Sequence, residues 1–268
     1  MRYNSYRDVL DTALRQSAAD LSCSTEDLLK EENTVVLSHP SEAARRYLKL
    51  PFCCNLVSYG AGVVASVSPQ FAALAERYIN SREAIRCFET PHILLFDEAL
   101  QKLGARLCFM ARYYLPDPEK LKPLPCHYTL RVLQAEELAP LHTAPWTNNA
   151  LSASRPQLDM LGVAAYDDEH IIGMAACSAD CDEMWQIGVD VLPAYRRQGV
   201  ASAVTSRLAY EVLKLGKLPF YCAAWSNTAS ARNAARSGFV PAWCELTALP
   251  AEDALAYAAP IPTEEETV

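Results

Sequence analysis

The most informative segment of the chain runs Val189-Asp-Val-Leu-Pro-Ala-Tyr-Arg-Arg-Gln-Gly-Val-Ala201. An apolar strand pattern at 183–191 leads into it, and a helical pattern at 198–215 follows, with apolar residues at spacings of three and four. The segment therefore predicts a strand, a loop and a helix N-terminus, which presents unpaired N–H groups suited to a phosphate. Gly199 and Ala201 leave room for a diphosphate, and Arg196 and Arg197 can add charge-assisted hydrogen bonds.

The charge of the chain changes sign at this segment. From Asp159 to Asp190 there are eight acidic residues and no lysine or arginine, whereas from Val191 to Val240 there are seven basic residues and one acid, Glu211. The whole chain of 268 residues has a net charge of −8. Two interpretations stay open: ordinary surface variation, or an anionic ligand held beside a cationic one.

Strands and helices are predicted to alternate around the segment. In the second half we expect a helix at 133–141, a hairpin of strands at 161–166 and 171–177, a strand at 219–225, a helix at 228–237 and a last strand at 239–246. In the first half we expect helices at 6–19 and 68–79, a short helix opened by the capping box at 24–27, and strands at 35–37, 55–59, 63–67 and 106–114.

Four prolines within residues 116–125 exclude a continuous helix or a central strand there, and we place the domain boundary in this run. The fold class expected is α/β (α+β). An N-terminal α/β domain occupies residues 1–120, a second domain of alternating strands and helices occupies 121–250, and a C-terminal tail, solvated at 262–268, occupies 251–268.

The segment 189–201 resembles the acyl-CoA-binding signature of the GNAT superfamily of N-acyltransferases, whose pattern is R/Q-x-x-G-x-G/A. Asn227-Thr-Ala-Ser230, followed by Ser237-Gly-Phe239, resembles the next motif of the family, so that the resemblance covers about residues 128–247. The resemblance implies that residues 121–250 form a mixed, twisted sheet flanked by helices, and that the two central strands of this sheet separate to admit pantetheine. It also implies transfer of an acetyl group from acetyl-CoA to a primary amine by direct attack of the amine.

The same resemblance assigns the residues that bind the co-substrate acetyl-CoA. Main-chain groups of Val189 and Val191, on either side of Asp190, are expected to pair with the pantetheine and to hold the thioester. Asn227 is expected to contact the pantetheine arm, and Ser230 to cap the short helix or to touch the cofactor. The diphosphate is assigned to Arg196, Arg197, Gln198, Gly199, Val200 and Ala201, with Ser202 at its edge. No metal is expected.

The catalytic groups are harder to assign. Three positions that carry an acid or a tyrosine in many relatives hold Trp185, Cys222 and Ala234 here. We take Glu183 as the candidate general base. Further candidates are Asp182, Tyr221 and Glu245.

Several alternatives stay open. A non-catalytic acyl-CoA-binding or sensor protein would also carry this motif with a degenerate active site. The acids Asp180, Asp182 and Glu183 favour a cationic acceptor amine. Gly60-Ala-Gly62 fits a hairpin turn or, as an alternative, a dinucleotide-binding turn. The first half is either a degenerate copy of the same fold or an unrelated domain.

Composition limits the remaining classes of function and the cellular location. The chain is 51% hydrophobic, which excludes global disorder, and its acidity argues against a nucleic-acid partner. The chain has a polar start, and prolines and glycines interrupt its uncharged stretch 50–75, so no membrane partner is expected. Its ten cysteines are scattered without a CxxC pair, which predicts a cytoplasmic protein with reduced thiols. A zinc site is the disfavoured alternative for the cysteines, and a homodimer is left open.

Overall fold

The computed structural model describes residues 2–257, so the solvated end expected at 262–268 lies outside the described residues. The chain forms two compact units. Within the described range, the first unit takes in residues 2–20, Glu42–Leu48 and Ala111–Trp243, and the second takes in Leu21–Ser41, Lys49–Met110 and residues 244–257.

These units differ from the expected division at residue 120, because the first unit draws on three separate parts of the chain. A buried ion pair between Asp20 and Arg45 joins the N-terminal helix to the segment Glu42–Leu48 within this unit. The proline run is not a free linker either. The N–H of Asp117 donates to the Gly238 carbonyl at 2.9 Å, and the N–H of Leu124 donates to the Ser206 hydroxyl at 3.0 Å.

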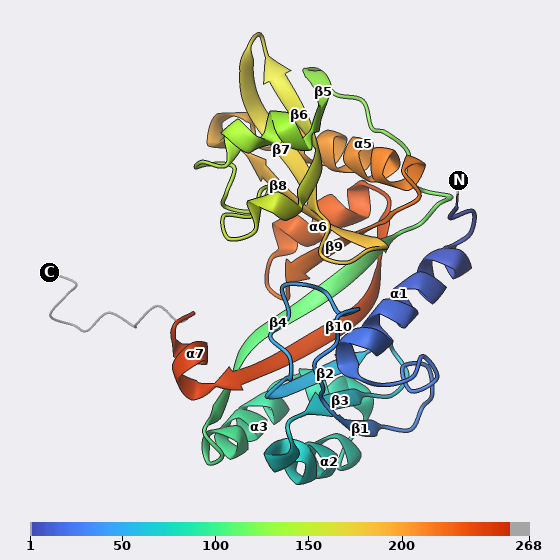
Figure 1. The fold of residues 1–268 in the computed structure, drawn as a ribbon, viewed down its shortest axis with the longest axis vertical. Coiled ribbons are helices and arrows are strands. Elements are labelled where there is room, and N and C mark those ends of the chain that lie inside the picture. The colour runs from blue at the N-terminus through green and yellow to red at the C-terminus, as the bar shows by residue number, and fades with distance from the viewer. Residues whose placement is uncertain (1, 258–268) are drawn as a thin grey trace, which may run out of the picture. The chain divides into compact units, whose positions relative to one another are not determined.

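The sheet of the first unit follows the strand order β10-β4-β9-β8-β7-β6-β5 (Figure 1). All the pairings recorded from β4 to β5 in this order are antiparallel except that of β8 with β9. The strands are β4 (Ala105–Pro116), β5 (Thr129–Gln134), β6 (Asp159–Asp167), β7 (His170–Ser178), β8 (Met184–Val191), β9 (Leu218–Ala224) and β10 (Phe239–Pro250).

Helix α5 (Val200–Lys214) packs against β6, β7, β8 and β9 (Figure 1). Val200, Val204, Leu208 and Val212 recur every four residues and are all buried, so one apolar stripe fixes the helix on the sheet. The first unit also holds α1 (Tyr6–Leu21), α4 (Ala135–Leu138) and α6 (Thr228–Arg236).

Most elements expected from periodicity are confirmed, each within a few residues of its predicted ends. The helix expected at 133–141 is a correction: residues 129–134 form β5, and the helix begins only at Ala135. The short helix expected after Ser24 is a turn, although Ser24 and Asp27 do exchange the hydrogen bonds of a capping box.

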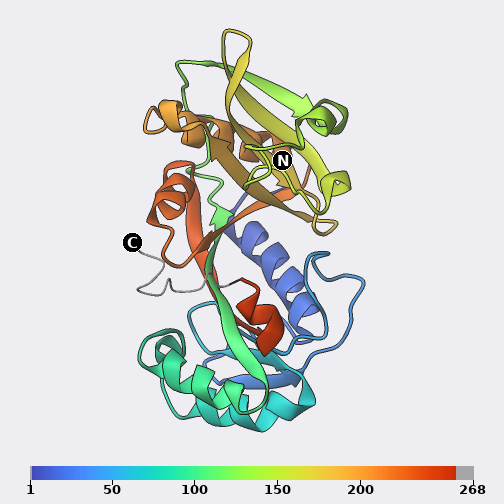
Figure 2. The ribbon, with the colours of Figure 1, turned by 90° about the vertical axis from the view of Figure 1, so that its left-hand side faces the viewer.

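The second unit carries strands in the order β1-β3-β2-β10-β4, with β1 (Thr34–Leu37), β2 (Cys54–Ser58) and β3 (Val64–Val67). Because β2 and β3 pair antiparallel across Gly60-Ala-Gly62, this turn is a hairpin, and the dinucleotide-binding alternative is wrong. Helix α2 (Ala72–Asn80) contacts β1, β3 and α3 (His92–Gln101) (Figure 2). Helices α3 and α7 (Ala251–Leu255) were not predicted.

The cysteines are all thiols, with no disulfide among them. Within residues 2–257, no three or more His, Cys, Asp or Glu side chains gather in a way that could hold a metal ion. None of the helices in that range combines the length and the apolar character needed to cross a bilayer.

Candidate functional site

Strands β8 and β9 pair in parallel over only four residues, from Met184–Leu218 to Ile187–Tyr221. Beyond that point each strand keeps its outer neighbour: β8 stays paired with β7 up to Val191, and β9 stays paired with β4 up to Ala224. The two strands therefore separate in the middle of the sheet. Main-chain groups of Gly188 to Val191 on the β9 side are left without a strand partner, and such groups require hydrogen bonds from elsewhere.

The loop that follows β8 has an unusual backbone. Arg197 and Gly199 have φ angles of +62° and +85°, and φ > 0 is uncommon for a residue other than glycine. Residues 196–199 are exposed, and α5 begins at Val200 without a capping side chain. A Cβ on Gly199 would have no atom within 4 Å, so the space beside the helix N-terminus is open. Left-handed turns that precede a helix expose consecutive N–H groups and form anion sites.

Two of the predicted diphosphate residues already have hydrogen-bond partners within the protein. Arg196 Nε donates to the Val191 carbonyl at 3.2 Å, and Gln198 Oε1 accepts the Tyr128 hydroxyl at 2.7 Å. By contrast, no hydrogen bond or ion pair joins the Arg197 side chain to any other of residues 2–257. The Arg197 guanidinium is therefore the charge in this loop that is available to an anion.

The first turn of α5 contributes main chain rather than side chains. Val200 is 1% exposed and Ser202 is 6% exposed, and the Ser202 carbonyl accepts the Ser237 hydroxyl at 3.4 Å. Ala201 is half-buried. The predicted role of Val200, Ala201 and Ser202 is thus restricted to their N–H groups.

The carboxylate of Asp190 holds the loop 147–150 against β8. It accepts the N–H groups of Asn149 and Ala150 and the amide of Asn149, each at 2.8 Å. The contact needs a glycine at position 188, because a Cβ there would overlap the Asn149 carbonyl. Asp190 was predicted within the pantetheine-binding segment, and in the structure its side chain positions this loop.

The second motif forms a small hydrogen-bonded network on α6. Asn227 Oδ1 accepts the N–H of Ser230 at 3.0 Å and so caps the helix. The Ser230 hydroxyl lies 2.8 Å from the hydroxyl of Tyr221, the last residue of β9 that pairs with β8. Tyr221 is 2% exposed, and burial raises its pKa, so its hydroxyl keeps its proton at neutral pH.

Glu183, the predicted base, is not brought to the opening between the strands. It directly precedes β8, at the end opposite to Gly188–Val191, and its carboxylate forms ion pairs with Arg2 and Arg15. At the three family positions, Trp185 and Ala234 are buried and Cys222 is half-buried.

A cavity of about 270 Å³ lies on the face of the sheet to which Gln186 and Gly188 contribute. Its floor includes a row of residues in register across three strands: Asp159 of β6 pairs with Ser178 of β7, which pairs with Gln186 of β8. Loop residues from Thr147 to Arg155, together with Asp180, complete the lining.

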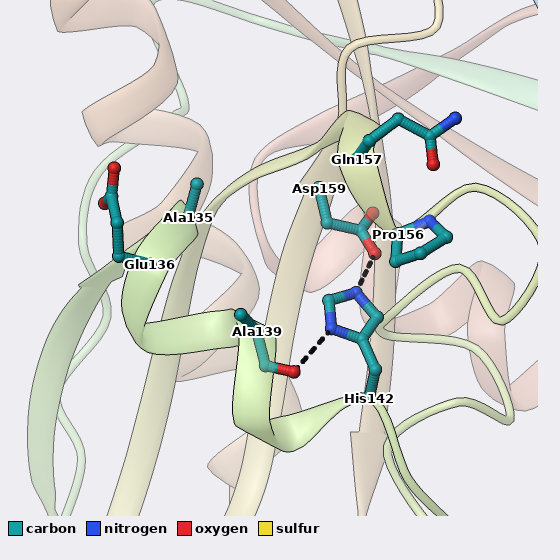
Figure 3. Close-up of a pocket in the computed structure, with 7 residues that line it drawn as sticks. All are labelled: Ala135, Glu136, Ala139, His142, Pro156, Gln157 and Asp159. Carbon is teal, nitrogen blue, oxygen red and sulfur yellow. Dashed lines mark hydrogen bonds and ion pairs between the residues drawn. The ribbon is translucent and has the colours of Figure 1, made fainter.

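A second cavity, of about 510 Å³, lies beside α4 and also reaches Asp159 (Figure 3). Here His142 Nε2 lies 2.9 Å from Asp159 Oδ2, and its Nδ1 lies 3.2 Å from the Ala139 carbonyl. Asp159 Oδ2 also accepts the N–H of Ser152 at 2.7 Å. Both ring nitrogens thus face acceptors, and the pair anchors the loop that covers the first cavity.

Sequence reasoning missed Arg155, Gln186, Gly188 and the His142–Asp159 pair. Their roles depend on a loop that returns over the sheet, and no local spacing reveals such a contact. The one usable signal is the single glycine within strand 184–191, because glycine inside a strand often marks close approach of another backbone.

Comparison with known proteins shows a family match over part of the chain. Residues 121–242 match the family model described as GNAT acetyltransferase. A search of curated protein sequences found no match.

Solved structures that match part of this chain include a GNAT-family acetyltransferase from Novosphingobium aromaticivorans, with 18% identity and a TM-score of 0.43, covering 54% of this chain and 66% of that one. A GCN5-related N-acetyltransferase-like protein from Streptococcus suis has 16% identity and a TM-score of 0.43, covering 56% and 66%. A GCN5-related N-acetyltransferase from Kribbella flavida has 20% identity and a TM-score of 0.46, covering 59% and 63%.

This chain spans less than two thirds of the length of each of those three proteins. The matched residues 121–242 fall within Ala111–Trp243 of the first unit, the part that contains the mixed sheet and its flanking helices. The C-terminal half of the chain is therefore GNAT-like and carries the GNAT acetyltransferase match, with a further α/β unit in the same chain.

Proposed function

We propose that the protein is an N-acetyltransferase that moves the acetyl group of acetyl-CoA to a primary amine by direct attack. The observation that carries this proposal is the separation of β8 from β9 after Ile187 and Tyr221, directly before an exposed loop with an uncapped helix N-terminus. A chain of amides such as pantetheine suits the unpaired edge of β8, and a diphosphate suits the loop.

In this arrangement the main chain of Val189 and Val191 pairs with the pantetheine. The N–H groups from Gly199 to Ser202, with the Arg197 guanidinium, bind the diphosphate. Asn227 keeps α6 capped beside the arm, and Ser230 acts through its contact with Tyr221. Tyr221 is suited to return a proton to the leaving thiolate, because it is buried, protonated and placed where the strands part.

The proposal is tested by release of CoA thiol from acetyl-CoA in the presence of a broad panel of primary amines and peptides. We expect thiol release that depends on the amine, with an acetylated product of matching mass. Binding of acetyl-CoA without transfer to any amine would contradict the proposal and would favour a non-catalytic acyl-CoA-binding protein.

A further inference from the structure

The cavity of about 270 Å³ adjoins the point where β8 leaves β9. Gln186 still belongs to the paired part of β8, whereas Gly188 is the first residue beyond the last pair, and both line the cavity. Alternate residues of a strand share one face, so the cavity continues along β8 towards the segment that we propose binds the thioester.

Asp180 provides a carboxylate in this cavity with weak protein contacts. Its Oδ1 lies 3.4 Å from the Ser178 hydroxyl and 3.8 Å from an Arg155 nitrogen, and no hydrogen bond or ion pair joins its Oδ2 to another of residues 2–257. The side chain of Asp180 is only 1% exposed. A buried carboxylate ordinarily has strong hydrogen-bond partners, so Asp180 has capacity for a ligand.

The neighbouring acids are already occupied. The Asp159 carboxylate accepts a hydrogen bond from the N–H of Ser152 and lies next to the His142 ring. Asp182 pairs with Arg46 at 2.9 Å, and Glu183 pairs with two arginines at the surface. Since the acids that favoured a cationic acceptor each have an arginine nearby, the charge of the site no longer favours a polycation.

Arg155 adds the complementary group. It lines the same cavity, and its Nε is buried without a hydrogen-bond partner among the described residues. A buried donor without a partner requires an acceptor from a ligand or a water molecule. The cavity therefore offers a carboxylate and a guanidinium a few ångströms apart, each with unused hydrogen-bonding capacity.

We propose that this cavity is the acceptor site and that it takes a small amine with a carboxylate beside its ammonium, as in a free α-amino acid. Asp180 removes the proton from that ammonium. This inference rests on the proposed acetyl transfer. The cavity, at about 270 Å³, lies slightly below the usual volume of ligand sites, about 300–1,000 Å³, and this size favours an amino acid over a larger polyamine or aminoglycoside.

The proposed transfer conserves protons and electrons. The ammonium gives one proton to Asp180, and its nitrogen lone pair forms a bond to the thioester carbonyl carbon. The C–S bond breaks with its electron pair on sulfur, the thiolate takes a proton, and the amide nitrogen loses its second proton. The net products are the N-acetyl amino acid, CoA thiol and one proton released to solvent.

The electrostatics of Asp180 agree with such a role. Burial raises its pKa to about 6, against the opposing effects of Arg155 and Arg45, while Asp159 acts in the same direction as burial. A general base works best when its pKa lies near the operating pH.

The experiment compares common α-amino acids with the matching amines that lack the carboxylate, as acceptors for the full-length protein with acetyl-CoA. We expect at least one amino acid to exceed its decarboxylated partner about tenfold or more in kcat/KM. Arg155→Gln should remove this preference by raising KM for the amino acid, without changing the affinity for CoA. Asp180→Asn should lower kcat about 100-fold or more and remove the rise of rate between pH 5 and 7.

Asp182→Asn is the matched control, since it removes a neighbouring exposed acid outside the cavity lining, and it should leave all these values unchanged. Equal rates with decarboxylated amines, or acetylation of peptide amino termini but not of free amino acids, would overturn the acceptor assignment while leaving acetyl transfer intact. An unchanged pH profile in Asp180→Asn would overturn the role of Asp180. If the wild-type protein transferred acetyl to no amine at all, the proposed function would fail and this inference with it.

Discussion

Replacement of Arg197 by glycine is expected to lower the affinity for CoA by roughly tenfold to 100-fold, because it removes a charge-assisted hydrogen bond to the diphosphate worth about 1.5–3 kcal/mol. The fold should tolerate the change. Arg197 has a φ of +62°, a conformation that costs a non-glycine residue about 1–2 kcal/mol, and glycine adopts it freely. Calorimetric titration with CoA gives the affinity, and thermal unfolding gives the stability.

Arg207→Ala is the matched control for this variant. Arg207 lies on α5, away from the loop, and its guanidinium pairs with Glu211 at 2.8 Å one turn further along the helix. Its loss should leave CoA affinity unchanged. Gly199→Glu, which adds both a carboxylate and a side chain at a φ of +85°, should weaken binding at least as much as Arg197→Gly. Equal affinities for the wild type and Arg197→Gly would place the diphosphate elsewhere.

Asp180→Asn is expected to raise the free energy of unfolding at pH 7.5 by about 3 kcal/mol. The pKa of Asp180 is about 6 in the folded state instead of its ordinary 3.8. The folded state therefore binds this proton more tightly than the unfolded state, so stability falls as the pH rises from about 4 to above 6. Each pKa unit corresponds to about 1.4 kcal/mol, and asparagine, which stays neutral, avoids this loss.

Denaturant unfolding at pH 4 and at pH 7.5 measures this effect. At pH 4 the carboxyl of Asp180 is largely protonated in the folded wild-type protein, so most of the difference between the two proteins should vanish. Asp182→Asn, at a side chain that is 90% exposed, should change stability by less than about 0.5 kcal/mol at either pH. A variant Asp180→Asn that is less stable than wild type at pH 7.5 would show that the carboxylate is a structural ion-pair partner.

When the replacement of a catalytic group makes a protein more stable, the native site holds that group at a cost in stability because the reaction needs it. The two experiments on Asp180 thus support each other. Loss of turnover together with increased stability at pH 7.5 is expected only if the buried charge serves the reaction. If the carboxylate were purely structural, its replacement would destabilise the protein, and activity would be lost only as a consequence.

The sequence predicted those parts of the fold that local pattern determines. The four-residue spacing of Val200, Val204, Leu208 and Val212 predicts α5 because a stripe of this period must face a sheet. The glycine and arginines of the 196–199 loop predict an anion site from local chemistry alone, and that site stays a prediction. The hairpin at Gly60–Gly62 follows from the β-branched residues on both sides.

The parts that failed depend on contacts between residues far apart in the chain. Helix α1 belongs to the first unit, where Asp20 at its end pairs with Arg45, and the periodicity of a sequence does not reveal such a contact. Glu183 looked available as a base because Arg2 and Arg15 are over 160 residues away in sequence. The cavity at Gln186 exists because Asp190 holds the loop at Asn149, and only the folded chain brings those two together.

A crystal structure of the protein with acetyl-CoA would locate the co-substrate relative to the opening between β8 and β9. We expect the diphosphate on the N–H groups that begin α5, within hydrogen-bond distance of Arg197, and the pantetheine along β8 from Val191 towards Gly188. The thioester should then open onto the cavity that contains Asp180. A diphosphate bound away from residues 196–202, or a pantetheine that leaves the space between β8 and β9 empty, would contradict this expectation.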